Sequence, residues 1–360
     1  MELKMTPLVL EECVHGIRAP SEEWRKRARQ RLDTLTKPVG SLGRLEDIVS
    51  QIAAIREGQL STSMDKAVYV FAADHGVTEE GVSAYPREVT RQMVLNFLAE
   101  GAAINVLARK HSAALHIVDV GVDTDFGPIF GLLHHKVRRG TRNMLREPAL
   151  REEEVSEALS IGYRLGCEAS AAGYSMIAIG EMGIGNTTAA SAVTCALTGV
   201  SAALTVGRGT GVDPPAFEHK VRVVQAAVAK HVCDIAMVSP MEILRCVGGL
   251  EIAAMTGMVL AGARHRIVVV LDGFISTAAA ALAVEMVPEA IGYLIAGHCS
   301  EEPGHKLLLD RLKLMPVLSL GMRLGEGTGA VLAMPVIESA IALYQQMATF
   351  SDAGVSGSAR

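Results

Sequence analysis

The feature that most constrains the fold is an alternation of short apolar runs with longer helical segments, which begins near residue 66. The short runs are rich in β-branched residues and show little polar alternation, as strands do in a parallel sheet covered on both faces. The longer segments, at 88–110, 152–172 and 217–231, repeat apolar residues with the period of a helix. Six runs are predicted to be strands: 67–72, 115–120, 176–179, 267–271, 293–296 and 317–320.

Strands that alternate with helices predict an α/β fold, here a Rossmann-like parallel sheet with helices on both faces. The sheet and its helices are expected to form a catalytic domain over residues 61–334. Residues 1–60 are predicted to form a small helical domain, with residues 335–349 packed beside it. The small and polar residues 351–360 are predicted to be a disordered tail.

Composition excludes several classes of protein. A net charge of −5 argues against a nucleic-acid partner, which is bound through clustered Lys and Arg. No stretch reaches the roughly 18 uninterrupted apolar residues of a membrane helix, and the N-terminus lacks the pattern of a signal peptide. The cysteines are scattered without Cys-x-x-Cys spacing. We therefore expect a cytoplasmic protein without a membrane partner, a zinc site or a redox centre.

Three glycine-rich turns follow predicted strands or helices, at 183–188, 207–211 and 325–329. A helix opens at the end of the first turn, and the free N–H groups of a helix N-terminus bind anions. Lys220, on a later helix, can add a positive charge to the same phosphate. Each turn alone is better explained as a plain tight turn, but together the three turns favour a phosphorylated ligand. Their glycine spacing matches neither a dinucleotide dehydrogenase nor a P-loop NTPase.

Glu326 lies between two glycines of the third turn, with Leu324 beside it as apolar surface. A carboxylate in partly apolar surroundings has a raised pKa, which suits a general base. The alternative is a glutamate that only stabilises the N-terminus of the next helix, by about 0.3–1 kcal/mol. Because ligands bind beyond the carboxyl ends of parallel strands, where the glycine turns converge, the catalytic interpretation is favoured.

Other polar residues at strand ends are ambiguous. His298 and His305 enclose two glutamates and a cysteine, but the spacing fits no standard metal-ligand pattern, so we expect loop residues and no metal site. Asp74 and His75 follow the first predicted strand, and Asp272 follows the fourth. For these three residues, structural and functional roles remain equally open.

Six segments in colinear order together resemble one family, the nicotinate-nucleotide–dimethylbenzimidazole phosphoribosyltransferases. The segments are KPVGSLGRLE at 37–46, AADHGVTEEGVSAYP at 72–86, EMGIGNTTA at 181–189, GRGTGVD at 207–213, DGFIS at 272–276 and RLGEGTG at 323–329. The resemblance implies transfer of phosphoribose from nicotinate mononucleotide to dimethylbenzimidazole, giving α-ribazole phosphate and nicotinate with inversion at the anomeric carbon. It implies no cofactor, and it implies a homodimer.

The resemblance also implies roles for single residues. Glu326 matches the base that removes the azole proton. Four residues match the pocket for the base substrate: Ser83, Gln92, Glu181 and Leu324. Eight match the region around the nucleotide's ribose and phosphate: Gly183, Gly185, Asn186, Thr187, Gly207, Arg208, Gly209 and Lys220.

Two other functions remain alternatives. The segment VVVLDGFIS at 268–276 resembles the strand and acid that bind ribose in transferases using phosphoribosyl pyrophosphate. That class has paired acids and a glycine-rich phosphate loop, whereas Asp272 stands alone and residues 277–281 contain no glycine. A nucleotide-binding regulatory protein without turnover is the second alternative, against which Glu326 speaks. The acceptor base also stays open, because one methyl group is worth only about 1–3 kcal/mol of discrimination.

Overall fold

The structure is a computed structural model, and it describes residues 14, 16–209, 211–232 and 237–356. Its centre is a sheet in which every strand pairing is parallel. The predicted α/β class with a parallel sheet is therefore confirmed. Across the sheet the strands lie in the order β3 (Leu132–His134), β2 (Ala114–Gly121), β1 (Lys66–Ala73), β4 (Met176–Met182), β5 (Val268–Leu271) and β6 (Leu294–Ala296).

Five of the six predicted strands are confirmed, as β1, β2, β4, β5 and β6. The sixth, at 317–320, is wrong: it makes only an isolated parallel bridge between His298 and Leu318. It follows Pro316 and its side chains are half-buried or exposed, so it lacks the burial on both faces that defines the other strands. The short edge strand β3 was missed, because three residues are too few to show the apolar pattern of a strand.

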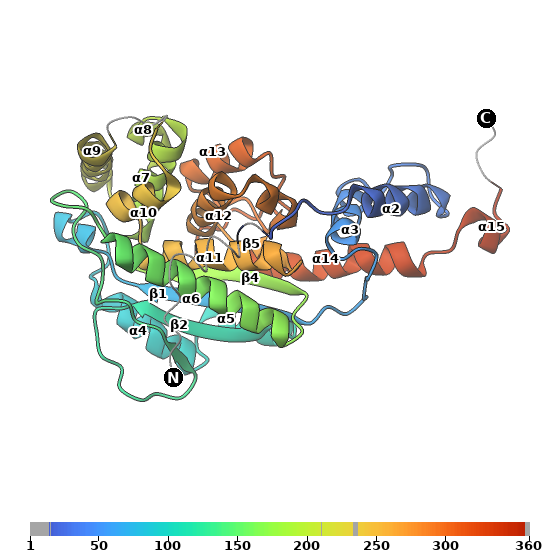
Figure 1. Cartoon of the computed structure of the whole chain (residues 1–360), viewed down its shortest axis with the longest axis horizontal. Helices are drawn as coiled ribbons and strands as arrows, with labels where there is room; N and C mark the ends of the chain where they lie inside the picture. Colours follow the sequence, from blue (N-terminus) through green and yellow to red (C-terminus); the bar gives the residue numbers. More distant parts are fainter. Residues whose placement is uncertain (1–13, 15, 210, 233–236, 357–360) are drawn as a thin grey trace.

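Helices fill the connections between the strands, except the one from β2 to β3 (Figure 1). The predicted helix at 88–110 is two helices, because Glu100 and Gly101 interrupt it and Glu100 has a φ of 59°. The helices are α2 (Glu22–Thr34), α3 (Arg44–Ile55), η1 (Gly76–Glu80), α4 (Glu88–Leu98), α5 (Ala103–Lys110), α6 (Glu152–Ala171), α7 (Asn186–Thr198), α8 (Ala202–Thr205), α9 (Pro214–His231), α10 (Pro240–Val247), α11 (Leu250–Arg264), α12 (Phe274–Met286), η2 (Pro288–Tyr293), α13 (Pro303–Leu312), α14 (Thr328–Gln346) and α15 (Phe350–Ala353).

The helices form two layers around the sheet. Right-handed crossovers place α4 and α5, between β1 and β2, on the opposite face from α6 and α11, which lead to β4 and β5. The contacts agree, because α14 packs against α5, whereas α6 and α12 pack against α11. The chain runs from β1 outward to β3 and then returns to place β4 on the other side of β1. This reversal leaves a crevice at the carboxyl ends of β1 and β4, where open sheets bind ligands.

Helix α14 extends beyond the sheet, and α2 and α3 lie along its far half (Figure 1). It is the one described helix that is long and apolar enough to cross a membrane, but half of that window is buried inside the protein, as in a core helix. The division into a helical and a sheet domain stays a prediction. The first residues of the predicted tail are not disordered, because Phe350–Ala353 form the short helix α15, which Thr349 caps; residues 357–360 lie outside the described part.

Candidate active site

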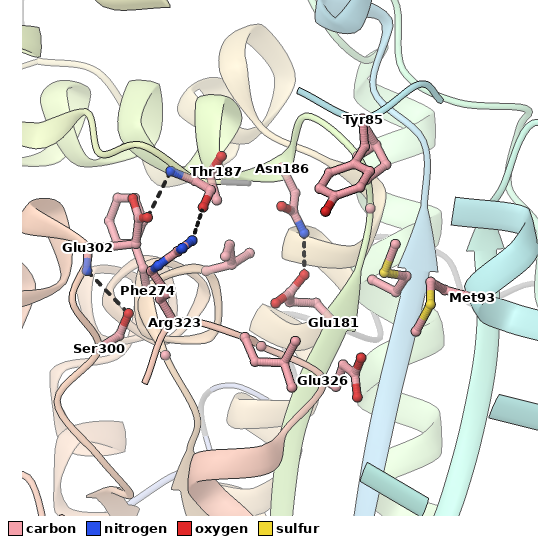
Figure 2. Close-up of a pocket in the computed structure, with 18 of the residues that line it drawn as sticks. Tyr85, Met93, Glu181, Asn186, Thr187, Phe274, Ser300, Glu302, Arg323 and Glu326 are labelled. Atoms are coloured by element: carbon pink, nitrogen blue, oxygen red, sulfur yellow. Dashed lines mark hydrogen bonds between the residues drawn. The ribbon is translucent and has the colours of Figure 1, made fainter. Parts of the chain in front are cut away.

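A cleft of about 430 Å³ opens at the carboxyl ends of β4, β5 and β6, next to the point where the strand order reverses. Six segments line it: the end of β4 with the start of α7, the start of α4 with Tyr85 before it, the turn at Gly209, the start of α12, the loop after β6 and the loop before α14 (Figure 2). The side chains that face it include Tyr85, Val89, Met93, Glu181, Asn186, Thr187, Phe274, Ser300, Glu302, Arg323, Leu324 and Glu326.

Glu326 sits in a turn of unusual backbone conformation. Gly325, Glu326 and Gly327 all have positive φ, at 90°, 63° and 88°. A side chain in this left-handed region is strained, by about 1–3 kcal/mol, and such strain persists only where the surroundings impose it. The turn also packs directly on β4, because a Cβ at Gly180 would lie 2.5 Å from the Gly327 nitrogen. Glu326 therefore lies against β4, not at the end of a sixth strand as predicted.

Asp272 holds this turn in place. Its carboxylate is buried and accepts hydrogen bonds from three backbone N–H groups, those of Gly327 at 3.1 Å, Gly329 at 2.7 Å and Ala330 at 3.2 Å. Asp272 thus caps the N-terminus of α14, which the helix dipole favours, and it fixes the backbone on which Glu326 stands. Asp272 does not line the cleft, so its position indicates a structural role.

The Glu326 side chain is buried at the wall of the cleft, with 5% of its surface exposed. Its Oε2 accepts a hydrogen bond from the Ile104 N–H at the start of α5 (3.3 Å). Burial raises the pKa of Glu326; the Ile104 hydrogen bond opposes this shift, and the Asp272 charge adds to it. The direction of the pKa shift is the one expected from the sequence.

Glu181 is a second buried carboxyl group in the cleft. Its Oε2 accepts a hydrogen bond from the Asn186 side-chain amide, and its Oε1 lies so close to Gly325 that a Cβ there would be 2.5 Å away. Burial, and then the negative charges of Asp272 and Glu251, raise the pKa of Glu181 to about 8. A carboxyl group with this pKa is mostly protonated at neutral pH and can donate a hydrogen bond.

The predicted anion site lies at the other end of the cleft. Helix α7 begins at Asn186, after Gly185 in the left-handed conformation, and Gly183, Asn186 and Thr187 line the cleft. Lys220 is buried behind this wall, where its Nζ donates hydrogen bonds to Thr187 Oγ1 (2.9 Å) and the Gly207 carbonyl (3.3 Å). Burial lowers the pKa of Lys220 to about 8, against the opposing effect of Glu302. Lys220 therefore supplies charge from behind the wall, without lining it.

The glycine turn at 207–211 reaches the cleft through Gly209, and Thr210 lies outside the described residues. Two side chains tie Gly209 to the opposite loops: Arg323 Nη1 donates to its carbonyl (3.0 Å), and Glu302 Oε1 accepts from its N–H (2.9 Å). Arg208 is exposed and does not line the cleft.

Ser83 and Gln92, predicted for the base pocket, are not among the residues that line the cleft. Ser83 Oγ accepts a hydrogen bond from the Tyr85 N–H (3.2 Å), and Gln92 is exposed on α4. The wall is formed by Tyr85, just before α4, and by Val89 and Met93, which lie four residues apart on one side of that helix (Figure 2).

Asp74 and His75 are buried outside the cleft. The His75 Nε2 lies 2.7 Å from Glu251 Oε1, and the Asp74 Oδ2 accepts a hydrogen bond from the Asp123 N–H (2.7 Å). His75 also packs beneath Gly185, where a Cβ would lie 3.2 Å from the His75 Cβ. These contacts brace the loops that carry the site and favour the structural alternative for both residues.

The two histidines after β6 differ: both ring nitrogens of His305 have protein partners, whereas His298 lines the cleft and its buried Nδ1 has no hydrogen-bond partner among the described residues. His305 Nδ1 accepts a hydrogen bond from the Ser300 N–H (3.0 Å), its Nε2 lies 3.0 Å from Thr277 Oγ1, and burial lowers its pKa to about 3. His298 Nε2 lies 3.7 Å from Asp272 Oδ1. Within the described part of the chain, no group of three or more His, Cys, Asp or Glu is placed to hold a metal ion.

The fold and site together define a transferase for a phosphorylated substrate: a buried carboxylate of raised pKa faces a cleft that ends at a helix N-terminus backed by a lysine. Comparison with known proteins narrows this class. A family model described as phosphoribosyltransferase matches residues 17–355. The chain belongs to this phosphoribosyltransferase family and is an enzyme.

Its relatives are similar over almost the whole chain. The nicotinate-nucleotide–dimethylbenzimidazole phosphoribosyltransferase of Geobacter sulfurreducens is 48% identical and covers 96% of this chain and 98% of its own length. The enzyme of the same name from Desulforudis audaxviator is 47% identical, with coverage of 97% and 98%. Among solved structures, CobT from Thermus thermophilus is 46% identical with a TM-score of 0.89, covering 93% of this chain and 100% of its own.

Proposed function

We propose that the protein transfers phosphoribose from nicotinate mononucleotide to a benzimidazole-type base, dimethylbenzimidazole, releasing nicotinate and forming α-ribazole phosphate. The observation that carries this proposal is the pairing, within one cleft, of buried Glu326 with the anion-binding N-terminus of α7. The names of the relatives supply the two substrates. A nucleotide and an acceptor base would meet in the part of the cleft that lies between Glu326 and the N-terminus of α7.

The reaction follows from the charges of the groups involved. Nicotinate leaves from a positively charged pyridinium nitrogen, so the electron pair of the breaking C1′–N bond returns to that nitrogen without an added proton. A nitrogen of the acceptor base attacks C1′ from the opposite face, which inverts the anomeric configuration. Glu326 takes the proton from the acceptor's other nitrogen as the new C1′–N bond forms. General-base assistance of this kind is typically worth about 10²–10⁴-fold.

The remaining side chains divide the cleft between the two substrates. Leu324, Met93 and Tyr85 line the cleft and offer apolar surface for a flat aromatic base. Glu181 is mostly protonated at neutral pH. It is placed to donate a hydrogen bond to the carboxylate of bound nicotinate or to the ring of a bound base. Thr187 and the backbone N–H groups at the start of α7 face the phosphate.

The test is to incubate the protein with nicotinate mononucleotide and dimethylbenzimidazole and to follow nicotinate release. Release with no added magnesium and no phosphoribosyl pyrophosphate is the expected result. Activity that requires phosphoribosyl pyrophosphate would instead support the alternative transferase class. Tight nucleotide binding with no release under any condition would support the regulatory protein.

We also infer that the enzyme works in the cytoplasm as a homodimer. The family resemblance supports the dimer, and so does the side chain of Phe130, which is fully exposed on a loop next to the edge strand β3. Large apolar side chains that are exposed in a single chain often lie in contacts between chains.

A further inference from the structure

The side chains that line the cleft have an unusual charge balance. Three are carboxyl groups, Glu181, Glu302 and Glu326, and all three are buried. Among the described lining residues, Arg323 is the one lysine or arginine. Lys220 is separated from the cleft by Thr187, to which its Nζ is hydrogen-bonded. A phosphate dianion in this cleft therefore meets one positively charged side chain directly.

Arg323 has donors to spare at this position. Its Nη1 donates to the Gly209 carbonyl (3.0 Å), and no carboxylate of the described residues lies within ion-pair distance of its guanidinium. A guanidinium carries five N–H donors in a planar fork that fits two phosphate oxygens at once. The close-up shows the Arg323 side chain pointing toward Thr187 at the start of α7, which is the anion-binding end of the cleft (Figure 2).

We propose that Arg323 binds the phosphate of the nucleotide substrate directly, opposite the N-terminus of α7. This inference rests on the proposed function and adds to it the residue that recognises the phosphate. Arg323 stands three residues before Glu326 and contacts the loop at Gly209. Binding of the phosphate thus orders the loop before α14, and with it the catalytic base. Glu302 Oε1 accepts a hydrogen bond from the Gly209 N–H. Because a carboxylate repels a phosphate, Glu302 limits the phosphate to the side of the turn that faces Arg323.

The test compares two substrates that differ only in the phosphate, nicotinate mononucleotide and nicotinate riboside. For Arg323→Met we expect kcat/KM on the nucleotide to fall about 10²-fold, because the phosphate loses a charge-assisted, bidentate hydrogen-bond partner. On the riboside the fall should stay within about threefold, so the preference for the nucleotide collapses. Arg323→Lys should recover part of the loss, because lysine keeps the charge but not the fork.

Arg222→Met is the matched control, because Arg222 is exposed on α9 and does not line the cleft; it should leave both substrates unchanged. An equal loss on nucleotide and riboside in Arg323→Met would overturn the inference, since Arg323 would then only hold the loop at Gly209. Binding of ribose 5-phosphate, measured by calorimetry, gives a readout that does not need turnover: it should weaken in Arg323→Met and not in the control. Absence of turnover in the unmodified enzyme would count against the proposed reaction, whereas unchanged ribose 5-phosphate binding would count against Arg323.

Discussion

At the scale of single residues, two carboxyl groups of one cleft differ because their surroundings differ. Burial raises the pKa of both groups; the Ile104 N–H opposes this rise at Glu326, whereas the charges of Asp272 and Glu251 add to it at Glu181. Carboxyl groups held in different surroundings within one cleft are a common arrangement in acid–base sites. This arrangement suits Glu326 for accepting a proton and Glu181 for donating a hydrogen bond.

The raised pKa of Glu181 makes a prediction about stability. Its pKa rises on folding from 4.5 to about 8, so the native state keeps a proton that the unfolded state releases in between. The stabilisation is complete below pH 4.5 and is lost as the pH rises through 8. In Glu181→Gln, which cannot ionise, the fall in unfolding free energy between pH 5 and pH 8.5 should be smaller than in the wild type by more than ~1 kcal/mol.

Urea denaturation at the two pH values measures this difference. Glu157→Gln, at an exposed position of α6, is the control and should follow the wild type. An identical pH dependence in Glu181→Gln and the wild type would mean that Glu181 is ionised in the folded protein.

Part of the candidate site was predictable from the sequence at this scale, because glycine turns mark their own positions. The turn at 183–188, Leu324 and Glu326 were found in this way and do line the cleft. Ser83 and Gln92 were placed there without such a marker. Gln92 lies on α4, where a shift of one position turns a side chain by about 100°. Glu302 and Arg323 were missed, because only the fold brings the loop after β6 and the loop before α14 together.

At the scale of secondary-structure elements, the N-terminus of α14 joins the fold to the chemistry. Asp272, at the end of β5, caps this helix and fixes the turn that carries Glu326. In Asp272→Asn, an NH2 group replaces one carboxylate oxygen, and this group cannot accept a hydrogen bond. At least one of the backbone N–H groups that Asp272 binds therefore loses its acceptor. We expect the unfolding free energy to fall by about 1–3 kcal/mol, and kcat to fall at least about tenfold with a smaller change in the KM for the nucleotide.

Steady-state kinetics and urea denaturation check both parts of this prediction. Asp310→Asn, on the exposed side of α13, is the matched control and should change neither quantity. A kcat that stays at the wild-type level in Asp272→Asn would show that the turn does not depend on Asp272.

Elements were predictable to the extent that both of their faces are buried. The strands β1, β2, β4, β5 and β6 are continuous apolar runs, so their positions follow from the sequence. The run at 317–320 has a similar composition but lies at the rim of the sheet, where burial depends on neighbours distant in the sequence. Composition therefore could not separate it from a true strand.

At the scale of the whole molecule, α14 runs from the active site to α2 and α3, so the helical part of the protein is attached to the helix that carries the catalytic turn (Figure 1). The proposed homodimer is tested at this scale. Light scattering coupled to size-exclusion chromatography should give twice the 38.1 kDa of one chain. A mass equal to one chain at micromolar concentration would exclude a stable dimer.

The central claim is that Glu326 is the base of a phosphoribosyl transfer, and Glu326→Gln tests it most directly. The measurement is nicotinate release from nicotinate mononucleotide and dimethylbenzimidazole at saturating concentrations, together with nucleotide binding by the same variant. We predict a fall in turnover of at least ~10² with nucleotide binding kept, because glutamine has the shape of glutamate but cannot accept the proton. Turnover near the wild-type rate in a folded Glu326→Gln variant would contradict the account.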